Sequence, residues 1–338
     1  MRLQLPPPSG RMCHAVLPVF IPFAGCPHRC IFCAQDRQTG RQPASIKNIL
    51  DDLEKTLAER QKQGLKPVEL AFYGGTFTAI PKEEQSLCLK TAAKWRERGV
   101  VCAVRCSTRP DAVDASRLST LREWGMDLVE LGVQSFSDQA LDAAQRGYAG
   151  EKAREGCRLV LDAGLKLGIQ LLPGMPGGTP EAFLEDVEQA LRLGPSCMRM
   201  YPCLVLEGTR LSALWREGRY TPWTLEACVR VLGRALALAW EKNVPVIRLS
   251  LAPEPALERA VLAGPRHPSL GSMIQGEALW LRLEPLLREC PAKSLRLPRH
   301  CSGFFAGFRG SLLPRWKELG IDRAAVTWID GNTACWDE

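Results

Sequence analysis

Strand-length apolar runs alternate with longer segments of helical periodicity through the first two thirds of this 338-residue chain. The expected strands are Val16–Phe23, Val68–Tyr73, Val100–Cys106, Leu128–Val133, Leu165–Leu172 and Cys197–Cys203. The expected helices are Ser45–Gln63, Lys82–Arg98, Val113–Trp124, Gln139–Arg146, Glu151–Ala163 and Pro180–Arg192. Because each helix carries the chain back across the sheet, successive strands pair in parallel. The pattern predicts an α/β fold of six βα units, too few to close an eight-stranded barrel.

After Tyr220 the pattern changes. The later elements expected are a helix over Leu225–Glu241, a strand over Val244–Leu249, a helix over Glu277–Glu289 and a strand over Ala325–Ile329. At the other end, Pro-Pro-Pro at residues 6–8 predicts a stiff lead-in to the first strand. We therefore expect an amino-terminal arm over residues 1–14, a partial barrel over 15–223 and a small α+β carboxyl-terminal extension over 224–338.

Three cysteines, Cys26, Cys30 and Cys33, lie at C-x3-C-x2-C spacing just after the first expected strand. Clusters that only carry electrons normally have four cysteine ligands, so three thiolates predict a [4Fe-4S] cluster with one iron open to a small molecule. A zinc site and a chance grouping are the alternatives, although zinc sites usually add a second C-x2-C pair and none follows. Nothing at the amino terminus reads as a signal peptide, so the 14 cysteines favour a reducing compartment over a disulfide framework.

The cysteine spacing resembles that of the radical S-adenosylmethionine enzymes. This resemblance implies a partial (βα)6 TIM-like barrel with its cluster loop after the first strand and its active site at the carboxyl ends of the strands. It also implies that S-adenosylmethionine binds the open iron, and that an electron from the cluster cleaves it to a 5′-deoxyadenosyl radical. Phe32 occupies the aromatic position of the family motif, where the side chain packs near the adenine.

The ends of the second and third strands carry residues that match cofactor-binding positions of that family. Gly74, Gly75 and Thr76 stand where the family has its Gly-Gly motif, and the resemblance implies that backbone carbonyls there accept hydrogen bonds from the methionine ammonium. Ser107 stands where relatives often place a carboxylate for the ribose hydroxyls. A serine hydroxyl still donates and accepts hydrogen bonds, but this position departs from the family pattern.

Three later segments resemble oxygen-independent coproporphyrinogen oxidases and the catalytic subunit of Elongator. The resemblance implies that Gln134 faces the cofactor, that Arg146 pairs with the methionine carboxylate, and that Gln170 lies near the ribose. For Arg146 the alternative is a cation at a surface helix end. The segment from Met200 to Tyr220 also resembles the Elongator subunit, although Glu207 replaces a residue that is often basic there.

The formal net charge of +7 is unevenly distributed: the segment Arg282–Arg323 holds nine Lys or Arg against four Asp or Glu. The same segment contains four aromatic residues, Phe304, Phe305, Phe308 and Trp316. Basic and aromatic side chains together could bind the phosphates and stack on the bases of a nucleic acid. The alternative is that the charged side chains only form a solvated rim. The longest apolar stretch, Ala15–Ala24, is too short for a bilayer span and is broken by prolines, so we expect a cytoplasmic protein with no membrane association.

These features leave three hypotheses open. The first is a radical enzyme acting on a tRNA base, without the acetyltransferase domain of the Elongator subunit, for which the segment after Tyr220 lacks room. The second is a radical enzyme acting on a small-molecule or porphyrin-like carboxylate, with Arg248, Arg266, Arg296 and Arg299 as anion clamps. The third is a non-catalytic iron–sulfur or zinc protein. Either enzyme requires a reductant such as flavodoxin or ferredoxin.

Overall fold

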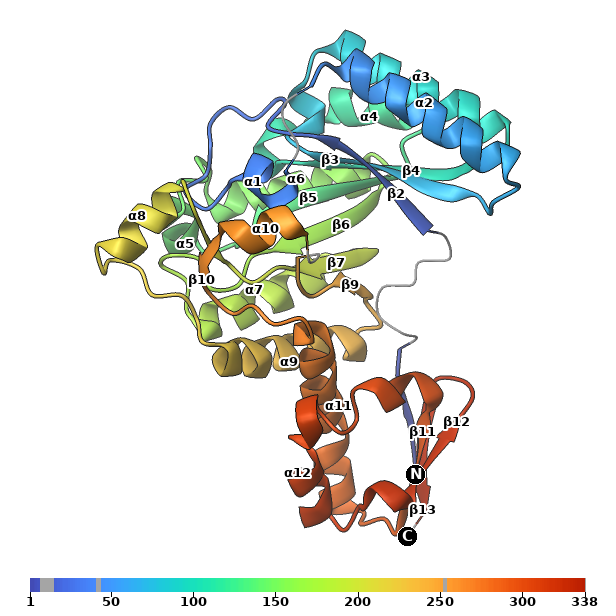
Figure 1. The fold of residues 1–338 in the computed structure, drawn as a ribbon, viewed down its shortest axis with the longest axis vertical. Coiled ribbons are helices and arrows are strands. Elements are labelled where there is room, and N and C mark those ends of the chain that lie inside the picture. Colours follow the sequence, from blue (N-terminus) through green and yellow to red (C-terminus); the bar gives the residue numbers. More distant parts are fainter. Residues whose placement is uncertain (7–14, 41–43, 252–253, 338) are drawn as a thin grey trace.

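A curled, entirely parallel sheet of seven strands forms the body of the molecule (Figure 1). The computed structural model describes residues 1–6, 15–40, 44–251 and 254–337. In spatial order, the strands are β2 (Ala15–Ile21), β3 (Val68–Gly74), β4 (Val101–Thr108), β5 (Leu128–Gln134), β6 (Lys166–Leu171), β7 (Cys197–Met200) and β9 (Val246–Arg248). The sheet curls without closing, which confirms the expected α/β partial barrel.

The sheet contains one strand more than the six predicted. The short β9 pairs in parallel with β7, and α9 (Leu225–Glu241) lies between them in the chain. A strand of three residues shows too little periodicity to predict which strand it pairs with, so we had expected this segment to belong to the carboxyl-terminal extension. The boundary expected at residue 224 stays a prediction, although the sheet draws its last strand from beyond it.

Helices pack on the outer, convex side of the sheet (Figure 1). They are α2 (Ile46–Lys62), α3 (Lys82–Glu97), α4 (Ala115–Glu123), α5 (Asp138–Ala143), α6 (Gly150–Asp162) and α7 (Pro180–Arg192). Local chemistry sets their starts: the side chains of Ser45, Asp114 and Thr179 each accept a hydrogen bond from a backbone N–H of the first turn. In α2, Leu50, Leu53 and Leu57 recur at helical spacing and are buried against the sheet.

Two expected elements end early for identifiable reasons. The strand expected over Cys197–Cys203 stops at Met200, because Pro202 has no N–H for the ladder and the chain bends toward the loop after β6. The helix expected over Gln139–Arg146 stops at Ala143. Gln145 and Gly147 then take positive φ values of 53° and 79°, which an α-helix does not allow. The resulting turn carries Arg146 into the functional site.

A second, four-stranded sheet lies beside the barrel, in the order β1-β13-β11-β12 (Figure 1). Its strands are β1 (Arg2–Gln4), β11 (Ser294–Pro298), β12 (Val326–Ile329) and β13 (Thr333–Asp337), and α11 (Leu270–Glu289) and α12 (Leu313–Glu318) pack against it. Within the expected amino-terminal arm, Arg2–Gln4 forms a strand that the sequence did not predict, and it pairs with β13 at the other end of the chain. Pro7 and Pro8 lie outside the described residues.

The aromatic residues of the carboxyl-terminal segment build a core. Trp316 is buried between Phe305, stacked at 4.7 Å, and Trp280, edge-on at 4.8 Å, and its indole N–H donates to the Phe305 carbonyl. Phe304 is buried too, and Phe308 packs edge-on against His267. The interpretation of these aromatics as a base-stacking surface was therefore wrong for the buried residues.

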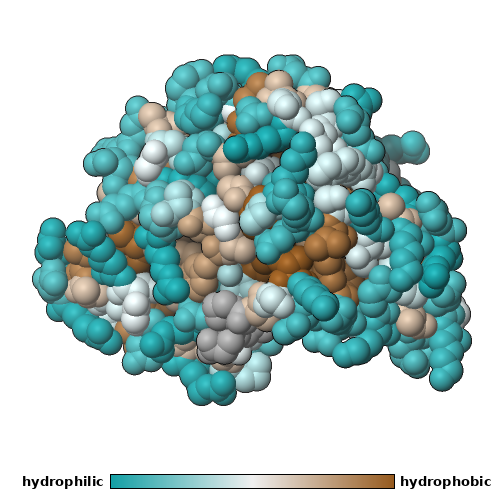
Figure 2. Space-filling model, turned by 90° about the horizontal axis from the view of Figure 1, so that it is seen from above, coloured by the Kyte–Doolittle hydropathy of each residue, from teal (hydrophilic) through white to brown (hydrophobic). Residues whose placement is uncertain are grey.

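Small elements gather at the carboxyl edge of the large sheet (Figure 1). They are α1 (Gln35–Thr39), β8 (Val205–Leu206), α8 (Arg210–Arg216), α10 (Pro255–Ala260) and β10 (Val261–Ala263). Figure 2 shows one face of the molecule, on which the largest apolar area lies near the middle and smaller apolar areas lie toward the left edge and the top, among hydrophilic side chains. Within the described residues, no helix is both long and apolar enough to span a bilayer.

Candidate functional site

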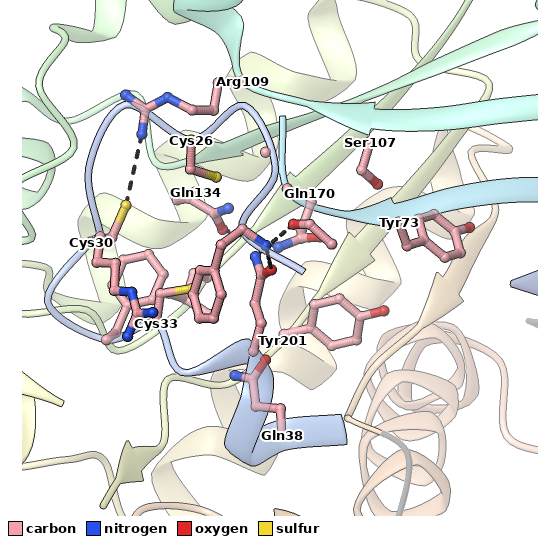
Figure 3. Close-up of a pocket in the computed structure, with 18 of the residues that line it drawn as sticks. Cys26, Cys30, Cys33, Gln38, Tyr73, Ser107, Arg109, Gln134, Gln170 and Tyr201 are labelled. Carbon is pink, nitrogen blue, oxygen red and sulfur yellow. Dashed lines mark hydrogen bonds between the residues drawn. The ribbon is translucent and has the colours of Figure 1, made fainter. Parts of the chain in front are cut away.

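All eleven residues predicted for the site line one pocket of about 280 Å³ at the carboxyl ends of the strands. They are Cys26, Cys30, Phe32, Cys33, Gly74, Gly75, Thr76, Ser107, Gln134, Arg146 and Gln170. In Figure 3 the three cysteines lie on one side of the pocket and Tyr73 and Tyr201 on the other, with Gln134 and Gln170 between them. The roles assigned to these residues stay predictions, but their convergence is a property of the fold.

Close backbone packing holds the cysteine loop against the end of β3. The Gly75 N–H donates to the Ile21 carbonyl at 2.9 Å, and the Thr76 N–H donates to the Ala24 carbonyl at 2.7 Å. A Cβ atom on Gly75 would lie 1.9 Å from the Ala24 oxygen, so no larger residue fits without moving the loop. The Gly-Gly motif therefore allows the cysteine loop to approach β3.

The three thiols are free, and their surroundings differ. The Cys26 sulfur lies 3.3 Å from the Thr76 hydroxyl, and the Arg146 guanidinium donates to the Cys30 sulfur at 3.0 Å. Burial, together with the smaller effect of the charges of Cys30 and Cys26, raises the pKa of the Cys33 thiol to about 12. Metal ligation requires the thiolate, so binding at Cys33 releases a proton.

The cysteine arrangement fits a cluster better than a single metal ion. Zinc draws all its ligands to within about 2.0–2.3 Å of one point. Among the residues that the structure describes, no three His, Cys, Asp or Glu side chains lie close enough to share one ion. A cubane cluster takes each thiolate on a different iron, so its ligands stand farther apart.

Two glutamines and a glycine carbonyl line the middle of the pocket. Gln170 Nε2 lies 3.4 Å from Gln134 Oε1. The Gly74 carbonyl accepts a hydrogen bond of 2.6 Å from the Gln35 side chain, whose oxygen in turn accepts from the Phe23 N–H at 2.7 Å. Gln35, which the sequence analysis did not single out, thus ties α1 and the cysteine loop to the Gly-Gly motif.

The loop after β5 is anchored from α7. Gln134 has a φ of 69°, unusual for a residue other than glycine. The next two residues are held by one buried carboxylate: Asp186 accepts from the Ser135 hydroxyl at 2.5 Å and from the Phe136 N–H at 2.7 Å. Burial raises the Asp186 pKa from its ordinary 3.8 to about 6, against the opposing effect of both hydrogen bonds.

Arg146 is buried, which excludes the alternative of a surface helix-end cation. Its Nη1 donates to the Cys30 sulfur at 3.0 Å and its Nη2 to the Gly132 carbonyl at 2.6 Å. Nε and Nη2 also lie 3.1 and 2.8 Å from the Tyr148 hydroxyl. The guanidinium is thus directed at the Cys30 sulfur, and pairing with the methionine carboxylate stays a prediction.

The inner face of the barrel carries a charge network that the sequence analysis missed. Arg105 binds the Glu69 carboxylate through Nε at 2.7 Å and Glu130 through Nη1 at 2.9 Å. Arg199 Nε lies 2.8 Å from Glu130, and its guanidinium reaches Tyr73 and Tyr201 at the pocket wall. Charged residues inside otherwise apolar strand runs were the available sequence signal.

The anion clamps proposed for a carboxylate substrate lie elsewhere. None of Arg248, Arg266, Arg296 and Arg299 lines the pocket. Arg266 pairs with Glu258, and Arg299 lies 3.5 Å from Asp330. The arginines that do border the pocket are Arg29, Arg109, Arg146 and Arg199.

Comparisons with known proteins agree with this geometry. Residues 20–190 match the Radical SAM superfamily, and residues 195–278 match the Radical_SAM C-terminal domain. Among curated proteins, the tRNA uridine(34) acetyltransferase of Methanocaldococcus infernus is 30% identical over 263 residues, 66% of this chain and 49% of that protein. The Elongator complex protein 3 of Mus musculus is 27% identical over 260 residues, 63% of this chain and 47% of that protein. The chain thus spans about half the length of these relatives.

Two solved structures share the fold. An archaeal Elp3 from Methanocaldococcus infernus, with an amino-terminal deletion, superposes with a TM-score of 0.60 at 23% identity, covering 81% of this chain and 63% of that chain. The coproporphyrinogen III oxidase HemN from Escherichia coli gives a TM-score of 0.51 at 20% identity, covering 68% and 53%. Since the first family model alone spans half of the sequence, this chain belongs to the radical SAM superfamily.

Proposed function

We propose that this protein is a radical S-adenosylmethionine enzyme that holds a [4Fe-4S] cluster on Cys26, Cys30 and Cys33. The observation that carries the proposal is the convergence of three free thiols and eight further predicted cofactor-binding residues on one pocket. When both cofactors are bound, they supply a 5′-deoxyadenosyl radical that abstracts a hydrogen atom. The residues of the protein bind and orient the cofactor and the substrate and exclude water from the site.

Each side of the pocket has its own task in this proposal. The cysteine loop holds the cluster, while the Gln134 and Gln170 amides and the Ser107 hydroxyl offer donors and acceptors to the nucleoside and methionine parts of the cofactor. Part of the pocket wall is apolar, which keeps water from the reacting atoms. This part is formed by Leu172, Leu204, Leu206 and Leu251. Tyr73 and Tyr201 lie on the side away from the cysteines, where a substrate would enter (Figure 3).

The substrate we infer is a base in tRNA. The two curated relatives described above are a tRNA uridine(34) acetyltransferase and an Elongator complex protein, and the match extends over about two thirds of this chain. Tyrosine rings beside an arginine suit a planar base, because stacking contributes about 1–3 kcal/mol per base. Arg199 is balanced by Glu130, so this wall favours a neutral ring over a free carboxylate.

A porphyrin-like carboxylate is the less favoured substrate. Its four proposed arginine clamps lie outside the pocket, and the resemblance to the Escherichia coli oxidase extends to the fold alone. A flavodoxin or ferredoxin as the electron donor, and a cytoplasmic location, stay predictions that accompany the proposed chemistry.

The test is anaerobic reconstitution with iron and sulfide, reduction, and mass spectrometry for 5′-deoxyadenosine made from S-adenosylmethionine, with and without unmodified tRNA. We expect formation that increases with tRNA, and transfer of deuterium from labelled tRNA into the product. Cys30→Ala should abolish formation, whereas Cys335→Ala, in the carboxyl-terminal sheet, should not. If Cys30→Ala still cleaves S-adenosylmethionine, the cluster assignment is contradicted. If the cluster-loaded wild type forms the same amount of 5′-deoxyadenosine with and without tRNA, the inference that tRNA is the substrate is contradicted.

A further inference from the structure

The three cysteine sulfurs of the pocket differ in their contact with positive charge. Cys30 lies beside two guanidiniums, with Arg146 Nη1 at 3.0 Å and Arg109 Nη1 at 3.8 Å; Figure 3 marks the second contact. The hydrogen-bond partner found for the Cys26 sulfur is a neutral hydroxyl, that of Thr76. Any cluster held here therefore meets concentrated positive charge at its Cys30 corner.

Arg109 is fixed in place by several partners. Its Nε and Nη2 form a two-pronged ion pair with Asp111, both at 2.8 Å, and Nη2 also donates to the Arg146 carbonyl at 2.5 Å. The Arg109 side chain is 6% exposed, whereas Asp111 is 25% exposed. A buried cation thus faces the sulfur, and its counter-charge lies on the side nearer to solvent.

The turn after α5 completes this arrangement. Positive φ values at Gln145 and Gly147 turn the Arg146 side chain toward Cys30. The Tyr148 ring lies 5.3 Å from the Arg109 guanidinium carbon and 5.1 Å from that of Arg146, and its hydroxyl donates to the Gly132 carbonyl. One tyrosine therefore holds both cations, and with Asp111 the local formal charge near Cys30 is +1.

We propose that Arg109, held by Asp111, sets the reduction potential of the cluster through the Cys30 sulfur. Reduction transfers one electron from the external donor to the cluster and adds one negative charge without forming or breaking a bond. A buried cation near a ligand sulfur stabilises that added charge, because charge and hydrogen bonding around the sulfurs tune cluster potentials. Arg109 acts through Cys30 and is a positioning residue. The inference rests on the three-cysteine cluster of the proposed function.

The test is a redox titration of the full-length, reconstituted protein, followed by the electron paramagnetic resonance signal of the reduced cluster. Arg109→Gln should lower the reduced-to-oxidised ratio at fixed potential at least tenfold, a shift of about 59 mV to more negative potential for one electron. Asp111→Asn should shift the potential the other way, since Arg109 loses its counter-charge. Arg109→Lys, which keeps the charge, should recover most of the wild-type value.

Opposite signs distinguish an electrostatic role from a structural one, because mere loosening of the loop would move both variants alike. Arg315→Gln, which breaks the Arg315–Glu277 ion pair in the carboxyl-terminal part, should leave the potential unchanged. Unchanged potentials, or shifts of one sign in both variants, overturn the inference. If Arg109→Gln fails to load iron, Asp111→Asn alone decides the test: a reduction potential in Asp111→Asn that is not more positive than that of the wild type overturns the inference.

Failure of this inference and failure of the proposed function give different results. A wild-type protein with a reducible cluster that makes no 5′-deoxyadenosine contradicts the proposed function, while the potential shifts still decide the role of Arg109. A wild-type protein that takes up no [4Fe-4S] cluster overturns both.

Discussion

Replacing Asp186 by asparagine tests whether a buried carboxyl on α7 supports the loop that carries Gln134. Asp186 accepts hydrogen bonds from Ser135 and Phe136, and burial raises its pKa from 3.8 to about 6. The folded protein therefore holds the proton more tightly than the unfolded chain. The stabilisation from this group is fully present below pH 3.8 and is lost as the pH rises through about 6.

The gap between 3.8 and about 6 corresponds to about 3 kcal/mol, at 1.36 kcal/mol per pKa unit. An asparagine cannot titrate, yet its oxygen still accepts from the Phe136 N–H. The difference in unfolding free energy between wild type and Asp186→Asn should therefore fall by about 3 kcal/mol as the pH rises across this window, with roughly two thirds of the fall between pH 4.5 and 7.

The assay is urea unfolding of the metal-free protein, followed by tryptophan fluorescence at intervals of half a pH unit. Glu188→Gln is the matched control, because Glu188 lies on the same helix in an exposed pair with Arg192 and should leave the pH dependence above pH 5 unchanged. If the unfolding free energies of the wild type and of Asp186→Asn change with pH in the same way from pH 4.5 to 7, the reasoning is refuted.

Three further predictions concern packing and charge. Arg105→Met should lower the unfolding free energy by about 3–5 kcal/mol, because it leaves buried carboxylates unpaired, whereas Lys94→Met, in a half-exposed pair, should cost less than about 1 kcal/mol by the same urea assay. Gly75→Ala should displace the cysteine loop and reduce iron bound per chain after reconstitution, whereas Gly303→Ala, whose Cβ meets open space, should bind iron normally. Gly233→Leu, at the contact of α9 with α11, should lower stability by about 1–3 kcal/mol in thermal or urea unfolding, and an unchanged midpoint would contradict the tight packing there.

Much of the barrel could be predicted because its determinants are local. Apolar runs and helical periodicity predicted six parallel strands and their helices, and the helix over Pro180–Arg192 matched residue for residue. The cysteine loop was also recognisable, because Cys26, Cys30 and Cys33 lie within eight residues. A pattern with a period of two or 3.6 residues is readable without knowing what it packs against.

The tertiary structure decided which distant residues meet. The pairing of β1 with β13, the addition of β9 to the large sheet and the burial of Trp316 depend on contacts that local periodicity does not encode. The convergence of Arg109 and Arg146 on Cys30 joins residues 79 and 116 positions from that cysteine. The sequence by itself determined most elements of the barrel and the spacing of the cysteine loop, because a few neighbouring residues specify each. The charge around that loop follows from folding, because the groups that supply it are brought together only when the strands align.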